Sequence, residues 1–111
     1  MGPKSLKLLE DMRDAADDIA AFTRGRSFGE YAADKQFRWS VERGFEIIGE
    51  ALSQLQKVDP ATAQRITDYR KIVSFRNILI HGYAAVNHGI TWDIVQTGLP
   101  ALRKQLNELL Q

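Results

Sequence analysis

Apolar residues recur every three or four positions along most of the 111-residue chain, a spacing typical of amphipathic α-helices. Two segments show it most clearly, residues 3–25 and residues 34–56. In the second, six apolar side chains fall within an arc of about 80° when successive residues turn by 100°. The core positions predicted for these two helices are Leu9, Met12, Ala16 and Ile19, then Phe37, Val41, Phe45, Ile48, Leu52 and Leu55.

Helix-capping signals divide the rest of the first eighty residues. Ser27 and Glu30 have the spacing of a capping box, which predicts a short helical turn between the first two helices. An Asp-Pro dipeptide at 59–60 predicts the start of a third helix, with the aspartate as N-cap and the proline in the first turn. We expect this third helix to run unbroken to His81 and to end at Gly82.

The last twenty residues predict a fourth helix. Thr91 is its expected N-cap, and Pro100 should kink the helix or split it in two. No segment shows the alternation of a β-strand. We therefore predict an all-α fold, an antiparallel four-helix bundle with a short extra helical turn and a Pro-kinked or split C-terminal helix, formed by residues 1–111 as a single domain.

Composition narrows the class of protein. Apolar residues make up 44% and charged residues 26%, as in an ordinary globular domain. The absence of cysteine excludes disulfides and thiolate zinc sites. No apolar run reaches the length of a bilayer span and the N-terminus lacks the apolar core of a signal peptide, so we expect a cytoplasmic protein without a membrane partner.

Positive charge gathers in one part of the chain. The net charge is only +1, but residues 61–91 carry three more basic than acidic side chains. This excess suits an anionic partner, although three charges are also compatible with a solvated face. It surrounds the stretch SFRNILIHGY at 74–83, where polar residues interrupt an otherwise apolar helix.

Arg76 is the most unusual of these polar residues, because it falls inside the apolar arc of its helix. A buried guanidinium without a partner is prohibitively costly. One solution is an ion pair with the acidic stripe of the second helix, Glu42, Glu46 and Glu50, which is otherwise a solvated face. The other is that part of the apolar arc faces a second subunit or a ligand. We hypothesise that at least one of the three glutamates pairs with Arg76.

The remaining polar residues lie near the predicted end of the helix. Asn77 precedes His81 by four positions, on nearly the same face, where it could orient the imidazole by a hydrogen bond. Tyr83 lies just past Gly82. Structural roles are also open: His81 could contact the last carbonyls of the helix, and Tyr83 could close over the core.

The candidate chemistry follows from the residues that the chain has and lacks. His81 and His88 match no zinc spacing, and the sequence contains neither a nucleophile elbow nor a glycine-rich phosphate loop. We therefore expect no metal and no cofactor. One histidine and one arginine form the minimal set for metal-independent RNA cleavage, with the imidazole as general base and the guanidinium stabilising phosphorane charge. A symmetric dimer would supply a second histidine.

The motif RNILIHGY at 76–83 resembles the Arg-Asn-x-x-x-His-x-Tyr signature of the HEPN superfamily. VERGFEIIGEAL at 41–52 and TWDIVQTGLPAL at 91–102 resemble the second-helix and fourth-helix signatures of its HepT-like toxins, which are paired with a minimal nucleotidyltransferase antitoxin, MntA. The resemblance spans about residues 6–110. The linker QKVDPATAQRITDY departs from it, being short and without the Pro-Trp pair of many members.

The resemblance implies a toxin endoribonuclease whose site forms at a homodimer interface. It implies that Arg76 and His81 are catalytic, that Asn77 positions His81, and that the antitoxin transfers AMP to Tyr83 and so blocks the RNA site. Arg70 and Lys71 are candidate RNA-binding residues in the positively charged part of the chain. A second interpretation is a non-catalytic HEPN module that binds or regulates a nucleotidyltransferase; a third is a structural bundle with a coincidental motif.

Overall fold

The computed structural model describes residues 1–82 and 86–111, and in these residues all regular structure is helical. The elements are α1 (Pro3–Thr23), α2 (Phe28–Ala33), α3 (Lys35–Val58), α4 (Pro60–Ala63), α5 (Tyr69–His81), α6 (His88–Asp93), the π-helical turn η2 (Ile94–Gly98) and α7 (Leu99–Leu109). The predicted all-α class is confirmed. Over the same ranges, no helix combines the length and the apolar character needed to cross a membrane.

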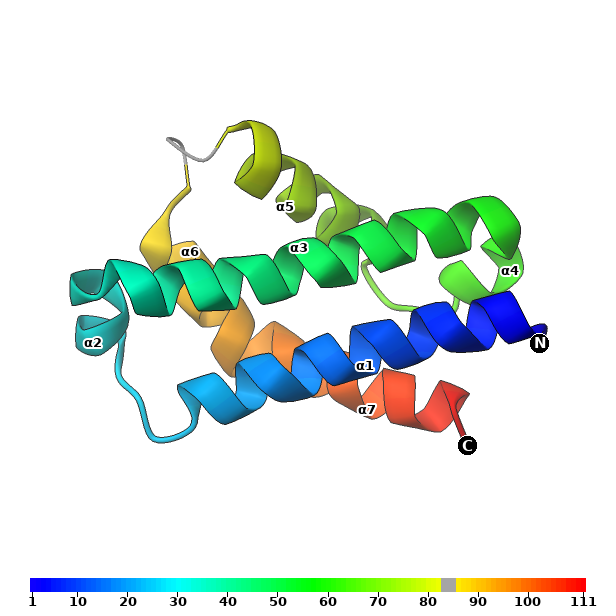
Figure 1. Cartoon of the computed structure of the whole chain (residues 1–111), viewed down its shortest axis with the longest axis horizontal. Coiled ribbons are helices and arrows are strands. Elements are labelled where there is room, and N and C mark those ends of the chain that lie inside the picture. Colours follow the sequence, from blue (N-terminus) through cyan, green and yellow to red (C-terminus); the bar gives the residue numbers. More distant parts are fainter. Residues whose placement is uncertain (83–85) are drawn as a thin grey trace.

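Helix α3 is the centre of the arrangement. It runs antiparallel to α1 along one side and contacts α5 on the other, while α7 packs against α1 (Figure 1). Every core position predicted for the first two helices is buried. Leu99, Leu102 and Leu106 of α7 complete the core between the long helices.

Two of the predicted helix starts are confirmed in detail. The Ser27 hydroxyl accepts a hydrogen bond from the Glu30 amide (3.2 Å) and the Glu30 carboxylate accepts one from the Ser27 amide (3.2 Å), which closes the capping box of α2. Asp59 caps α4, and its carboxylate also accepts hydrogen bonds from the hydroxyls of Thr62 (2.7 Å) and Ser5 (2.9 Å). The Ser5 contact ties the start of α1 to the end of α3.

The prediction of one unbroken helix over residues 60–81 is wrong. The chain leaves helical geometry after α4 and re-enters it at Tyr69, through Asp68 in the left-handed region (φ 61°). The turn buries Ile66, and Gln105 of α7 holds it, accepting from the Thr67 amide (3.1 Å) and donating to the Thr67 hydroxyl (2.6 Å). These tertiary contacts change the direction of the chain between α4 and α5, so that α5 does not continue the axis of α4.

The prediction of Thr91 as an N-cap is also wrong. Helix α6 begins at His88, and its cap is Asn87, whose side chain accepts from the Ile90 amide (3.1 Å). Thr91 is fully buried inside the helix and donates to the carbonyl of Asn87 (3.3 Å). The C-terminal helix, expected to be kinked or split at Pro100, is interrupted there: the π-helical turn η2 joins α6 to α7 without leaving helical geometry, and Pro100 lies in the first turn of α7.

Candidate active site on helix α5

Helix α5 carries the predicted site and is the least enclosed of the longer helices. It lies against α3, on the side away from α1 (Figure 1). Of its apolar residues only Leu79 is buried, and Ile78 is 45% exposed. The others of the predicted apolar arc are half-buried: Tyr69, Ile72, Val73, Phe75 and Ile80. The arc is therefore only partly covered within one protomer.

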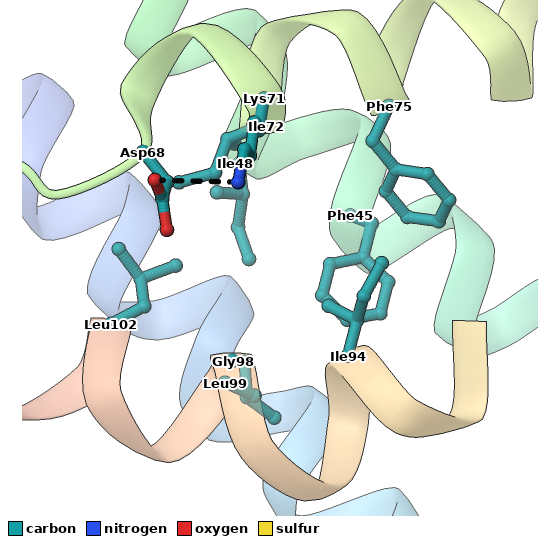
Figure 2. A pocket seen from close by; sticks show the side chains of 10 residues that line it. All are labelled: Phe45, Ile48, Asp68, Lys71, Ile72, Phe75, Ile94, Gly98, Leu99 and Leu102. Atoms are coloured by element: carbon teal, nitrogen blue, oxygen red, sulfur yellow. Dashed lines mark ion pairs between the residues drawn. The ribbon is translucent and has the colours of Figure 1, made fainter. Parts of the chain in front are cut away.

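A cavity of about 220 Å³ separates part of α5 from η2 and α7. Figure 2 shows Ile72 and Phe75 of α5 pointing toward it, with Ile94, Leu99 and Leu102 on the opposite side. Phe45 of α3 and Phe75 meet edge to face, with ring centroids 5.6 Å apart. The following residues line the cavity: Phe45, Ile48, Asp68, Lys71, Ile72, Phe75, Ile94, Gly98, Leu99 and Leu102. The cavity accounts for the incomplete burial of Ile72 and Phe75, the two residues of the apolar arc that line it.

Arg76 is held against α3 at a glycine. A Cβ atom built on Gly49 would overlap the Cβ of Arg76 and lie 2.7 Å from its Cγ, so the stem of the arginine rests directly on the α3 backbone. At the tip, Nη1 donates to Oδ1 of Asn77 (2.9 Å). The Nε atom is buried and has no hydrogen-bond partner. The guanidinium is therefore bonded at one edge and unsatisfied at Nε.

The acidic stripe does not pair with Arg76 in this structure. Glu50 is exposed and Glu42 and Glu46 are half-buried, and none of the three forms an ion pair with Arg76. Our hypothesis of a Glu–Arg76 pair is therefore not met within one protomer. The arginine stem rests on Gly49 instead, and the one hydrogen bond that the guanidinium makes goes to Asn77 of its own helix.

Asn77 and His81 occupy exposed positions on α5. The structure brings Asn77 to Arg76, with which it shares the 2.9 Å hydrogen bond, and records no bond between Asn77 and His81. His81 is the last residue of α5, and Gly82 caps the helix through its amide, which donates to the carbonyl of Ile78 (2.8 Å). Tyr83 lies outside the described residues. Arg76 and His81 thus share one helix but point in different directions.

The two candidate RNA-binding residues lie at the opposite end of α5 from His81. Arg70 donates from Nε to the hydroxyl of Tyr69 (3.1 Å), and Lys71 lies 3.9 Å from the carboxylate of Asp68. Both basic side chains are exposed. No group of three or more His, Cys, Asp and Glu side chains that could hold a metal ion lies in the part of the chain that the structure describes.

Helix α6 is anchored by an aromatic cluster centred on Tyr31, a residue that the sequence analysis did not single out. Tyr31 of α2 is fully buried and packs on Trp92 of α6, with ring centroids 5.2 Å apart. Phe37 and His88 meet the Tyr31 ring edge to face, at 5.4 and 6.2 Å. Burial raises the pKa of Tyr31, and the nearby Glu42 carboxylate raises it further. This cluster fixes where the chain re-enters helix after the site.

We predict that Glu42→Gln stabilises the protein at neutral pH. Burial raises the pKa of Glu42 and the Glu46 charge adds to this, although Arg38 opposes it. The folded state therefore binds the proton more tightly than the unfolded state, and stability falls as the pH rises from the ordinary glutamate pKa through the raised one. Melting temperatures should show the variant above wild type at pH 7, with the difference vanishing near pH 4, close to the ordinary value of about 4.3.

Glu50→Gln is the matched control, because Glu50 lies on the same helix but is exposed. Its melting temperature should follow wild type across the pH range. A Glu42→Gln protein that melts below wild type at pH 7 would show that the carboxylate has a stabilising partner.

Comparison with known proteins gives one consistent family. The family model described as "Ribonuclease HepT-like" matches residues 12–109. The chain is 32% identical over 98 residues to "Putative RNase MJ1380" of Methanocaldococcus jannaschii, covering 88% of this chain and 89% of that protein. It is 32% identical over 104 residues to "Probable ribonuclease HepT" of Thermococcus cleftensis, covering 91% of each. No solved structure gives a significant match.

Proposed function

The chain belongs to the HepT-like ribonuclease family, and we propose that it is a metal-independent endoribonuclease, the toxin of a toxin–antitoxin pair. The observation that carries the proposal is the state of Arg76. Its stem is seated on α3, and its guanidinium is bonded to Asn77 and has no carboxylate partner among the described residues. An arginine held in place with unused donor capacity is suited to an anionic substrate such as an RNA phosphate.

The chemistry requires a base, an acid and a stabiliser of negative charge. The His81 imidazole removes the proton of a ribose 2′-hydroxyl, and the 2′-oxygen attacks the adjacent phosphorus. The 5′-oxygen of the next nucleotide leaves and takes a proton from an acid, which yields a 2′,3′-cyclic phosphate and a 5′-hydroxyl. The Arg76 guanidinium stabilises the charge that develops on the phosphorane oxygens.

A homodimer supplies the groups that one protomer lacks. His81 lies five positions after Arg76 on the helix, which corresponds to about 7.5 Å along the axis and about 140° around it. One protomer therefore directs the two side chains apart, and it provides only one imidazole for both the acid and the base. In a two-fold dimer, a second protomer would cover the exposed part of the apolar arc of α5. Such a dimer would bring the His81 of both protomers to one site.

Control of the toxin is proposed to occur at Tyr83, through transfer of AMP by a nucleotidyltransferase antitoxin. Tyr83 follows His81 by two residues, so chain connectivity keeps the two Cα atoms within about 7 Å. The Tyr83 hydroxyl would lose its proton and attack the α-phosphorus of ATP, pyrophosphate would leave, and the product would carry a phosphodiester charge and a nucleotide beside the catalytic histidine. Both the charge and the volume oppose binding of RNA.

Expression in bacterial cells tests the toxin function. Wild type should arrest growth and degrade cellular RNA, and His81→Ala should do neither at the same protein level. Co-expression with a cognate nucleotidyltransferase should restore growth and add the mass of one adenylyl group to the protein, as read by intact-mass measurement. Tyr83→Phe should remain unmodified and toxic in the presence of the partner.

Other outcomes separate the alternatives. Growth without arrest, combined with stable binding of the nucleotidyltransferase, would favour the non-catalytic HEPN module. Arrest by both wild type and His81→Ala would contradict the proposed catalytic role of His81.

A further inference from the structure

We propose that Gly49 is a positioning residue for Arg76: the missing side chain on α3 lets the arginine stem rest on the helix backbone and so fixes the direction of its guanidinium. The expected effect on catalysis rests on the proposed function, but the contact between Gly49 and the Arg76 stem does not. Gly49 lies in the middle of a 24-residue helix, where glycine disfavours helix formation. The close approach of α5 explains why a glycine occupies this position of α3.

The contact leaves no room for any side chain at position 49. A Cβ atom there would overlap the Cβ of Arg76, lie 2.7 Å from its Cγ and lie 3.4 Å from the carbonyl oxygen of Ile72. The first atom belongs to the rigid base of the arginine, so a rotation about the outer bonds of the side chain cannot relieve the overlap. Helix α5 would have to lift from α3.

The seat at Gly49 also determines the environment of the guanidinium. With the stem against α3, Nε is buried while Nη1 reaches Asn77. The Nε–H group is a reporter of this geometry, because a buried donor exchanges its hydrogen slowly with solvent. If α5 moved away from α3 far enough to make room for one methyl group, the Nε atom of Arg76 would become exposed to solvent.

Gly44 provides a matched control on the same helix. A Cβ atom at position 44 would lie 2.5 Å from Cγ1 and 2.7 Å from Cδ1 of Ile19, so a methyl group there also meets a neighbouring helix, although these are outer atoms of a side chain that can rotate. That methyl group is directed at α1 and the core, however, and not at α5. Gly44→Ala and Gly49→Ala therefore make the same substitution within α3 at two helix interfaces, only one of which contains Arg76.

The first measurement needs no enzymatic activity. Hydrogen exchange at Arg76 Nε, assigned by its loss in Arg76→Lys, should be slow in wild type and in Gly44→Ala and fast in Gly49→Ala. Slow exchange in Gly49→Ala would overturn the proposal. If Gly49→Ala does not fold, the contact can be tested in wild type by nuclear Overhauser effects between the Gly49 α-protons and the Arg76 β-protons. Their presence would support the contact of the Arg76 stem with Gly49, and their absence would overturn it.

The second measurement is the kinetics of RNA cleavage. A displacement on the order of 1 Å can lower a rate about 100-fold, so we expect Gly49→Ala to lose about that much in kcat with little change in KM. Gly44→Ala should keep its kcat. An unchanged kcat in Gly49→Ala together with fast Nε exchange would overturn the link to catalysis. Absence of RNA cleavage by wild type would instead count against the proposed function, and the exchange data would still decide the geometry.

Discussion

Arg76→Ala should lower kcat for RNA cleavage about 100- to 1,000-fold, as removal of one preorganised donor to a developing oxyanion does. The melting temperature should stay close to that of wild type. The guanidinium forms no ion pair with Glu42, Glu46 or Glu50, and its Nε is buried without a partner, so its removal leaves no carboxylate unpaired. Alanine also retains the Cβ atom that rests on Gly49.

Arg76→Lys is the informative second variant. Lysine keeps the positive charge but lacks the planar fork that binds phosphate oxygens in two places. Cleavage between that of wild type and Arg76→Ala would indicate that both charge and geometry contribute. Full activity of Arg76→Ala, measured on purified protein, would contradict a role for the guanidinium in the reaction.

When wild type and His81→Ala are mixed, the RNA-cleavage activity of the dimers should be proportional to the square of the wild-type fraction. If one site uses two imidazoles, one from each protomer, a dimer with a single His81 lacks either the acid or the base. After co-refolding at equal amounts, about a quarter of the wild-type activity should remain, because only a quarter of the dimers then carry both histidines.

The measurement is the initial rate of RNA cleavage across a series of mixing ratios at constant total protein. A linear decrease, with half of the activity at equal amounts, would show that each protomer acts alone and would contradict the shared site. Dimer mass by light scattering, at each ratio, controls for assembly.

Patterns local in sequence predicted much of the fold. The apolar stripes of the first two helices, the capping box of Ser27 and the cap at Asp59 depend on spacing along one helix, and all are present. The break between α4 and α5 was missed because no glycine or proline marks it. It depends on burial of Ile66 and on hydrogen bonds from Gln105, almost forty residues away in sequence.

The candidate site likewise combines a feature that the local sequence predicted with one that depends on tertiary packing. The helical wheel identified Arg76 as an arginine that needed an explanation, but it could not identify what lies opposite. We expected a glutamate beside the guanidinium, and the structure shows instead Gly49 beneath the stem and Asn77 at the guanidinium. A signal for this was present: two glycines inside one long helix, Gly44 and Gly49, weaken the helix unless other elements approach closely. Which element approaches each glycine is a matter of tertiary packing.

The direct test of an Arg/His ribonuclease is cleavage of a defined RNA by purified wild type and His81→Ala in excess EDTA. Wild type should cleave the RNA without added metal and leave 2′,3′-cyclic phosphate ends, and His81→Ala should be at least about 100-fold slower, as expected when a general acid–base group is lost. Equal rates for the two proteins, or loss of wild-type cleavage in EDTA, would contradict metal-independent catalysis by His81.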